Sequence, residues 1–359
     1  MWNNGISISV FGESHGNYIG AVAENFPCGY NIDLDELSAF LMRRSAKNDG
    51  TTTKRVEDDN PQVISGIYNE KTTGAPLAIL IKNENQNSDD YDMLKDIARP
   101  SHSDYTAFIK YKGNNDARGG GHFSGRLTAP IAAIGGIAKQ ILAHHNIFVG
   151  AHILSLGGIF DQKFDNINLN KFVLDKLAKN DFSTIDNVIG EKMSQMVKST
   201  QERNDSIGAK VECAIIGMPA GIGGPLFDGL ESVISSIIFA IGGVKGIEFG
   251  SGFSGCDMFG SQNNDNFIVK NEKVEMSSNN HGGILGGISS GMPIIFNVAI
   301  KPTPSIATMQ DGYNLQKNQV EKISIKGRHD PCIALRATCV VESCAAIAVL
   351  GQCVKAGTI

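Results

Sequence analysis

The chain has 359 residues, of which 42% are hydrophobic and 19% are charged, so it is long and apolar enough to bury a large core. Lysine and arginine number 32 against 37 aspartates and glutamates, and the formal net charge is −5. This balance excludes the strongly basic composition typical of proteins that bind nucleic acid or anionic membranes, and the 41 glycines follow no collagen-like repeat.

The first half of the chain predicts strands, tight turns and two helices. Residues 6–10 alternate apolar side chains with serine, which is typical of a half-buried strand, and Gly12 follows as a turn. Asp33 with Glu36 three residues later predicts a helix start, and that helix ends at Arg43 and Arg44. The remaining predicted elements are strands over 63–67 and 76–81, a turn over 71–74, and a long apolar helix from 128 to about 145.

The second half begins with a polar segment. Residues 161–205 are rich in Asn, Asp and Lys, and predict a peripheral excursion with short amphipathic helices. The predicted elements that follow are strands over 211–217, 244–249 and 294–300, an apolar helix over 228–240, glycine-rich loops over 242–255 and 282–291, and a closing helix from about 336.

Strand pairing and helix composition together indicate the fold class. The predicted strands come in hairpin-like pairs, and the long helices are too apolar to face solvent. This pattern favours an α+β fold with helices buried against antiparallel sheets. Neither a proline-rich linker nor an internal repeat divides the sequence, so residues 1–359 are predicted to form a single large domain.

The cysteines and the apolar stretches indicate a cellular compartment. The seven cysteines include no CxxC pair, which favours free thiols in a reducing cytoplasm over a disulfide framework or a zinc site. The amino end lacks a basic, apolar leader. Lys139 and Glu342 interrupt the longest apolar stretches, so we expect a cytoplasmic protein with no membrane span.

Two glycine motifs match nucleotide-binding patterns only in part. Gly250–Gly255 fits GxGxxG, but the polar segment after it predicts no helix, which argues against a dinucleotide fold. Gly120–Leu127 has the outer glycines of a phosphate-binding loop, with Arg126 and Leu127 in place of its Lys and hydroxyl residues. Leucine binds no metal, whereas exposed backbone N–H groups beside an arginine still form an anion site.

Histidines and arginines are the candidate functional residues. Five of the eight histidines lie in loops rich in glycine or proline, and none forms a metal-binding His pair on a helix. We therefore predict no metal site, and proton transfer fits these side chains better. Arginines in the same loops predict a concave site for a small, multiply anionic substrate. The loop histidines are His15, His102, His122, His281 and His329.

These loops resemble the motifs of the chorismate synthase family, in the same order and along nearly the whole chain. The resemblance implies a β-α-β sandwich with long helices between antiparallel sheets, assembled as a homotetramer. The matching blocks are FGESHG at 11–16, RPSHSDY at 99–105, RGGGHFSGRLTAP at 118–130, DSIGAKV at 205–211, NNHGGILGGISSG at 279–291, KPTPSI at 301–306 and GRHDPC at 327–332.

The resemblance also implies an activity. Members of the family convert 5-enolpyruvylshikimate 3-phosphate to chorismate and phosphate, by a 1,4-elimination that uses reduced FMN without net redox change. The chemistry belongs to the cofactor, while the protein supplies position and charge. No nucleic-acid or membrane partner is implied.

The family's site residues transfer to this chain by position. His15 and His102 match two acid histidines, one for the reduced flavin and one for the leaving phosphate, and Asp330 matches the aspartate that acts as base with the flavin. Ser14, Arg43, Arg99 and Arg126 match substrate-binding positions. The FMN-binding positions fall on His122, Phe123, Ser124, Gly242, Gly243, Gly286, Lys301, Pro302, Thr303, Pro304, Ser305 and Arg328.

Two departures from the family pattern bear on the cofactors. Phe123 stands where many members have a hydroxyl residue, and residues 45–49 replace a Pro-Gly and basic segment, which weakens the case for a nicotinamide contact. Two alternatives to the lyase stay open: an NADPH-dependent flavin reductase, alone or in addition, and a non-catalytic anion-binding protein. The second predicts that His15→Ala and His102→Ala leave every activity unchanged.

Overall fold

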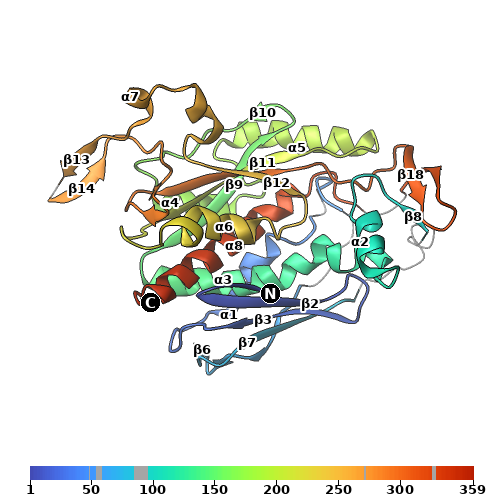
Figure 1. Ribbon diagram of the computed structural model, residues 1–359, viewed down its shortest axis with the longest axis horizontal. Helices are drawn as coiled ribbons and strands as arrows, with labels where there is room; N and C mark the ends of the chain where they lie inside the picture. The colour runs from blue at the N-terminus through green and yellow to red at the C-terminus, as the bar shows by residue number, and fades with distance from the viewer. Residues whose placement is uncertain (48, 54–58, 85–95, 271, 326–328) are drawn as a thin grey trace.

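The computed structural model describes residues 1–47, 49–53, 59–84, 96–270, 272–325 and 329–359. Two five-stranded antiparallel sheets enclose the helices α3 (Thr128–His144) and α8 (Ala334–Lys355), as Figure 1 shows. This arrangement confirms the predicted α+β sandwich. The first sheet has the order β1 (Trp2–Asn4), β2 (Ile6–Gly12), β3 (Tyr18–Glu24), β7 (Leu77–Lys82), β4 (Gln62–Ser65), and the second has β10 (Ile159–Phe160), β9 (Phe148–Leu156), β11 (Ala209–Ile216), β17 (Ile294–Ile300), β12 (Val244–Phe249).

The two central helices are apolar over most of their surface because both sheets and a neighbouring helix cover them. Gly135 of α3 allows α8 to approach closely, since a Cβ there would lie 2.2 Å from the Ser343 Cβ. Of the described helices, α8 alone has the length and apolar character of a membrane span, and 94% of that window is buried inside the protein. Its composition is therefore that of a core helix.

The helix predicted after Asp33 is α1 (Leu34–Met42), and the Asp33 side chain accepts hydrogen bonds from the backbone N–H groups of Asp35 and Glu36. Strand β9 was missed, because a continuous apolar run does not distinguish a buried strand from a buried helix. His152, which follows the helix predicted from 128 to about 145, is a fully buried residue of β9.

Residues 161–205 form α4 (Lys171–Lys179) and α5 (Asn187–Glu202), and the second is longer than the short helices predicted there. Leu174 and Leu177 of α4 pack with Ala214 and Ile295 of the second sheet. Asp161 and Glu212 contact the two ring nitrogens of His152, at 3.2 and 2.9 Å. The assignment of the whole chain to one domain stays a prediction.

The remaining elements surround this sandwich. After β12 the chain forms a short 3-10 turn over Gly252–Asp257, so the GxGxxG motif does not open a dinucleotide-binding helix. The other elements are β5 (Ile67–Tyr68), β6 (Lys71–Thr72), β8 (Ile97–Ala98), α2 (Asp104–Tyr111), α6 (Leu230–Ile238), α7 (Gly260–Asn263), β13 (Phe267–Lys270), β14 (Lys273–Met276), β15 (Ile284–Leu285), β16 (Ile288–Ser289), β18 (Gln310–Asn314) and β19 (Gln319–Ile323).

Candidate active site

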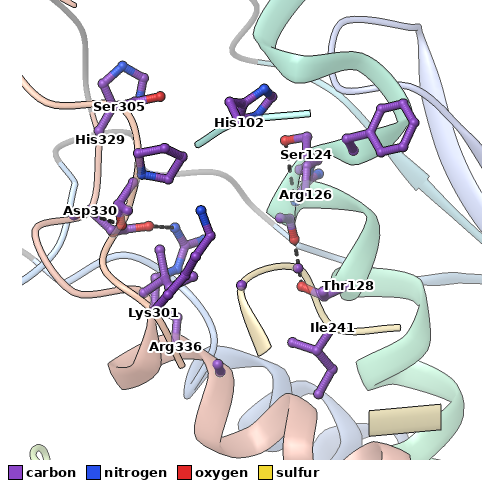
Figure 2. A pocket seen from close by; sticks show the side chains of 18 of the residues that line it. His102, Ser124, Arg126, Thr128, Ile241, Lys301, Ser305, His329, Asp330 and Arg336 are labelled. Carbon is purple, nitrogen blue, oxygen red and sulfur yellow. Dashed lines mark hydrogen bonds and ion pairs between the residues drawn. The ribbon is translucent and has the colours of Figure 1, made fainter. Parts of the chain in front are cut away.

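A cavity of about 570 Å³ opens where several loops meet the amino ends of α3 and α8. Figure 2 shows the labelled side chains arranged around it, with Asp330 joined to Arg336. Most of the residues predicted for the site line this cavity, although they come from distant parts of the sequence. They are Ser14, Arg99, His102, Phe123, Ser124, Arg126, Gly242, Gly243, Lys301, Pro302, Thr303, Pro304, Ser305 and Asp330.

A glycine run brings the two predicted acid histidines together. Gly119 and Gly120 have positive φ angles of 58° and 84°. A Cβ on Gly119 would lie 2.6 Å from the His15 ring, and a Cβ on Gly120 would lie 3.4 Å from the His102 ring. The backbone therefore passes closely beside both imidazoles, which requires glycine. His15 is buried behind this run, while His102 lines the cavity.

His102 belongs to a charged network with Arg99 and Asp104. The Asp104 carboxylate lies 2.6 Å from His102 Nδ1 and accepts from Arg99 Nε at 2.7 Å. Arg99 Nη1 also donates to Ser305 Oγ at 3.0 Å. Burial alone would raise the pKa of Asp104, but hydrogen bonds from Arg99 and His102 hold that pKa well below its usual range. The carboxylate is therefore ionised.

A second buried carboxylate bridges two arginines of the cavity wall. Asp59 accepts from Arg44 Nη1 at 2.6 Å and from Arg126 Nη1. Burial lowers the pKa of Arg44 despite this pairing, and Arg336 and Arg126 lower it further. Burial raises the pKa of Asp59, yet the two guanidinium groups lower it more. Arg44 and Arg126 thus present fixed positive charge to the cavity.

Arg43, which was predicted to bind substrate, lies outside the described cavity lining. Its guanidinium forms a bidentate pair with Glu342 of α8, at 2.9 and 2.6 Å, and Lys139 bonds the same carboxylate. Successive residues at a helix end point about 100° apart, so when Arg43 faces the core its neighbour Arg44 faces the cavity. The sequence analysis selected Arg43, but of these two adjacent arginines it is Arg44 that lines the cavity.

Asp330 is held from two sides. Its carboxylate accepts from the Thr53 backbone N–H at 2.9 Å and from Arg336 Nη1 at 2.8 Å. Arg336 Nε donates to the Arg44 carbonyl oxygen at 2.6 Å, so the start of α8 is tied to the end of α1. Arg336 and His329 line the cavity too, although the sequence-based site list omitted both. For His329 the available signal was its position beside Asp330 in the GRHDPC block, whereas Arg336 lies outside that block, near the start of α8.

The cavity has a basic corner and an apolar wall. Lys301 donates to the Ser101 carbonyl oxygen at 2.6 Å, and burial together with nearby Lys245 lowers its pKa. A group between these two lysines meets concentrated positive charge, which suits a phosphate. The apolar wall consists of Phe239, Ile241, Val244, Ile333, Ala337 and Val340.

Two other predicted residues lie elsewhere. The exposed His122 has its Nδ1 2.9 Å from the Gly12 carbonyl oxygen, which directs the ring to β2. Gly286 is in the turn between β15 and β16, and like His122 it is outside the described lining. Arg328 is outside the described residues. The functional roles of the whole predicted set stay predictions.

A cationic cavity with an apolar wall and buried carboxylates behind its arginines defines a site for a small polyanionic molecule. Comparison with known protein families then identifies the family of this chain. The family model described as chorismate synthase matches residues 6–354. The chain therefore belongs to the chorismate synthase family, whose members are lyases of aromatic biosynthesis.

Individual relatives agree with this assignment. The chain is 41% identical over 352 residues to the chorismate synthase of Dehalococcoides mccartyi, covering 98% of this chain and 96% of the relative. It is 41% identical over 339 residues to that of Pyrococcus abyssi, covering 94% and 92%. A crystal structure of chorismate synthase superposes with a TM-score of 0.75 at 24% identity, covering 98% of this chain and 92% of the other, so the fold is the same.

Proposed function

We propose that this chain converts 5-enolpyruvylshikimate 3-phosphate to chorismate and phosphate by 1,4-elimination, as the last step of the shikimate pathway. The observation that carries the proposal is the charge of the cavity. Arg44, Arg99, Arg126, Arg336 and Lys301 line one space, and this substrate carries two carboxylates and a phosphate. Arginine forks suit carboxylates and phosphates because they bind both oxygens of a planar group at once.

We further propose that reduced FMN shares this cavity. The apolar wall offers a surface for a flat ring system, and Lys301, Thr303 and Ser305 are suitable partners for its phosphate. Gly242 leaves room beside this wall, since a Cβ there would meet no atom within 4 Å. When bound, reduced FMN supplies a transient electron that returns at the end of the reaction, so that no net redox change results.

The protein's own groups then have distinct tasks. The elimination breaks one ring C–H bond and the C–O bond to phosphate, and forms a second double bond in the ring. Asp330 is the group assigned to the ring proton, because its ionic contact with Arg336 orients the carboxylate at the cavity. His102 is assigned to the leaving phosphate, because it lines the cavity next to Arg99.

An anaerobic assay tests the reaction and its cofactor. Purified protein with substrate and dithionite-reduced FMN is expected to release phosphate and chorismate in equal amounts. Absence of both products would refute the proposal. A second reaction with NADPH and oxidised FMN tests flavin reductase activity, and NADPH oxidation without the shikimate compound would show that this activity is also present.

We propose that the protein works as a cytoplasmic homotetramer. Exposed apolar side chains support self-association, since contiguous patches of this kind mark interfaces. They include Phe267, Val269 and Val274 of the β13–β14 hairpin, with exposed fractions of 70%, 76% and 67%. All seven cysteines are free, which suits a reducing compartment. Light scattering coupled to gel filtration tests the subunit number, and a monomer would contradict it.

A further inference from the structure

The carboxylate of Asp104 has no place in the catalytic roles above, yet it contacts a residue that does. Asp104 is the first residue of α2 and follows His102 by two positions. One oxygen, Oδ1, lies 2.6 Å from His102 Nδ1 and accepts from Arg99 Nη2 at 2.8 Å. The other oxygen, Oδ2, accepts from the backbone N–H and the Nε of Arg99, at 3.0 and 2.7 Å. These bonds fix the carboxylate in place.

The chemistry of these partners determines the proton position on a neutral His102 ring. An ionised carboxylate only accepts hydrogen bonds, so the nitrogen at 2.6 Å from it, Nδ1, must carry the proton. Arginine only donates, and Arg99 Nη2 lies 3.0 Å from His102 Nδ1 and 3.2 Å from Nε2. The arginine therefore does not select a tautomer by itself. The short contact with Asp104 does, and once Nδ1 carries the proton only Nε2 has a lone pair left to accept from Arg99.

The other ring nitrogen lies beside the glycine run. A Cβ on Gly120 would lie 3.4 Å from both Cε1 and Nε2, and the His102 side chain itself lines the cavity. The His102 side chain is only 15% exposed, so few other orientations of the ring are available to it. An imidazole in this tautomer can accept a proton at Nε2, and the imidazolium that forms can return it.

We propose that Asp104 is a positioning residue: it holds the neutral His102 ring with the proton on Nδ1, so that Nε2 is the nitrogen that takes up and returns a proton during the reaction. The inference rests on the proposed function only for the identity of the group that exchanges this proton. Arg99 contributes by holding both oxygens of Asp104, so that the carboxylate cannot rotate away from the ring.

Nitrogen-15 spectra of histidine-labelled protein test the tautomer without any substrate. At a pH where the imidazoles are neutral, the His102 signals, assigned by their loss in His102→Gln, are expected to show protonated Nδ1 and unprotonated Nε2. In Asp104→Asn the amide can donate to Nδ1, so the Nε2-protonated form is expected to increase. Wild-type protein with the proton on Nε2 would overturn the inference, whatever the folding of the variant.

Kinetics give a second readout. Asp104→Asn is expected to lower kcat by about 10²-fold or more with little change in KM, the loss typical of a mispositioned acid or base. In the His102→Gln background the same change is expected to cost little more, because the two residues act as one unit. Equal losses in both backgrounds would show that Asp104 does not act through His102.

A matched control separates charge removal from position. Asp311→Asn removes a carboxylate from an exposed pair with Lys322 and is expected to change neither the spectra nor kcat. The two proposals fail differently. If wild-type protein makes no chorismate but Asp104→Asn shifts the tautomer, the proposed function is wrong and the positioning role stands. If chorismate forms and the tautomer is unaffected by Asp104→Asn, the positioning role is wrong.

Discussion

Two buried carboxylates in this protein each bridge two cations, but in different surroundings. Glu342 lies in the middle of the core helix α8 and binds Arg43 and Lys139. Asp59 lies behind the cavity wall and binds Arg44 and Arg126. Both arginines of the Asp59 cluster line the cavity, whereas neither cation of the Glu342 cluster does. The same ion-pair chemistry thus joins core elements in one region and arranges charge for a ligand in the other.

The largest expected effect is the loss of protein stability when the cluster of Glu342, Arg43 and Lys139 is disrupted. Glu342→Gln leaves Arg43 and Lys139 with no buried counter-charge, and we expect the free energy of unfolding to fall by about 3–5 kcal/mol. Urea denaturation measures it. The matched control is Asp175→Asn, which removes a half-exposed partner of Lys171 and is expected to cost less than about 1 kcal/mol. Similar losses in both variants would contradict the structural role of Glu342.

The same cluster predicts acid sensitivity. Burial raises the pKa of Glu342, but Arg43 and Lys139 more than offset this and lower it from 4.5 to about 2. A depressed folded-state pKa contributes stability above the unfolded value, and this contribution is lost as pH falls from about 4.5 through 2. We expect a loss of up to about 3 kcal/mol over this range.

Urea midpoints of wild type and Glu342→Gln at several acidic pH values measure that loss. The variant is expected to show a flatter dependence between pH 4.5 and 2, because the titrating carboxyl is gone. Parallel curves would mean that Glu342 is not the group responsible.

Substrate binding distinguishes the two adjacent arginines. Arg44→Lys is expected to weaken affinity for 5-enolpyruvylshikimate 3-phosphate by about tenfold or more, since a lysine cannot reproduce the bonds from Arg44 to Asp59, Thr128 and Gly125. Arg43→Lys is the matched control and is expected to lower stability with little change in affinity. Calorimetric titration measures the substrate affinity of both variants. A larger loss of affinity in Arg43→Lys than in Arg44→Lys would refute our assignment of Arg44 to the site.

The smallest effect concerns one hydroxyl. Thr128 Oγ1 accepts from Arg44 Nε at 3.0 Å and donates to the Gly125 carbonyl oxygen at 2.6 Å. Thr128→Ala is expected to weaken substrate affinity by a few-fold, which corresponds to about 0.5–1.5 kcal/mol for a lost neutral hydrogen bond. Thr128→Ser keeps the hydroxyl and is expected to restore the affinity. An unchanged affinity in Thr128→Ala would show that Arg44 keeps its position without this bond.

Local sequence signals predicted the helices well and one strand poorly. Helices α1, α3 and α8 were expected from a cap at Asp33 and from long apolar stretches, which depend on neighbouring residues alone. Strand β9 was missed because its burial on both faces removes the alternation that reveals a strand. The sequence analysis expected neither the hairpin β13–β14 nor β18–β19.

The sequence predicted many of the residues that line the cavity, but not the carboxylates that hold their side chains. Gly242, Gly243, His102 and Asp330 were selected from the sequence, and the structure places them around one cavity. Asp59 and Asp104 were not selected. Asp59 has no local pattern, because its importance comes from partners that folding brings close, such as Arg126, which is 67 positions away. Asp104 lies in the RPSHSDY block with its partners Arg99 and His102, so a local signal was available there.

The sequence by itself determined the apolar helices, the antiparallel class of the sheets and, through seven ordered motifs, the family. Only the tertiary structure decided which arginine lines the cavity and which pairs with Glu342. Arg43 and Arg44 have the same side chain and adjacent positions, so no composition or spacing distinguishes them. The direction in which α1 ends against α3 and α8 distinguishes them, because that packing turns one guanidinium to the core and the next to the cavity.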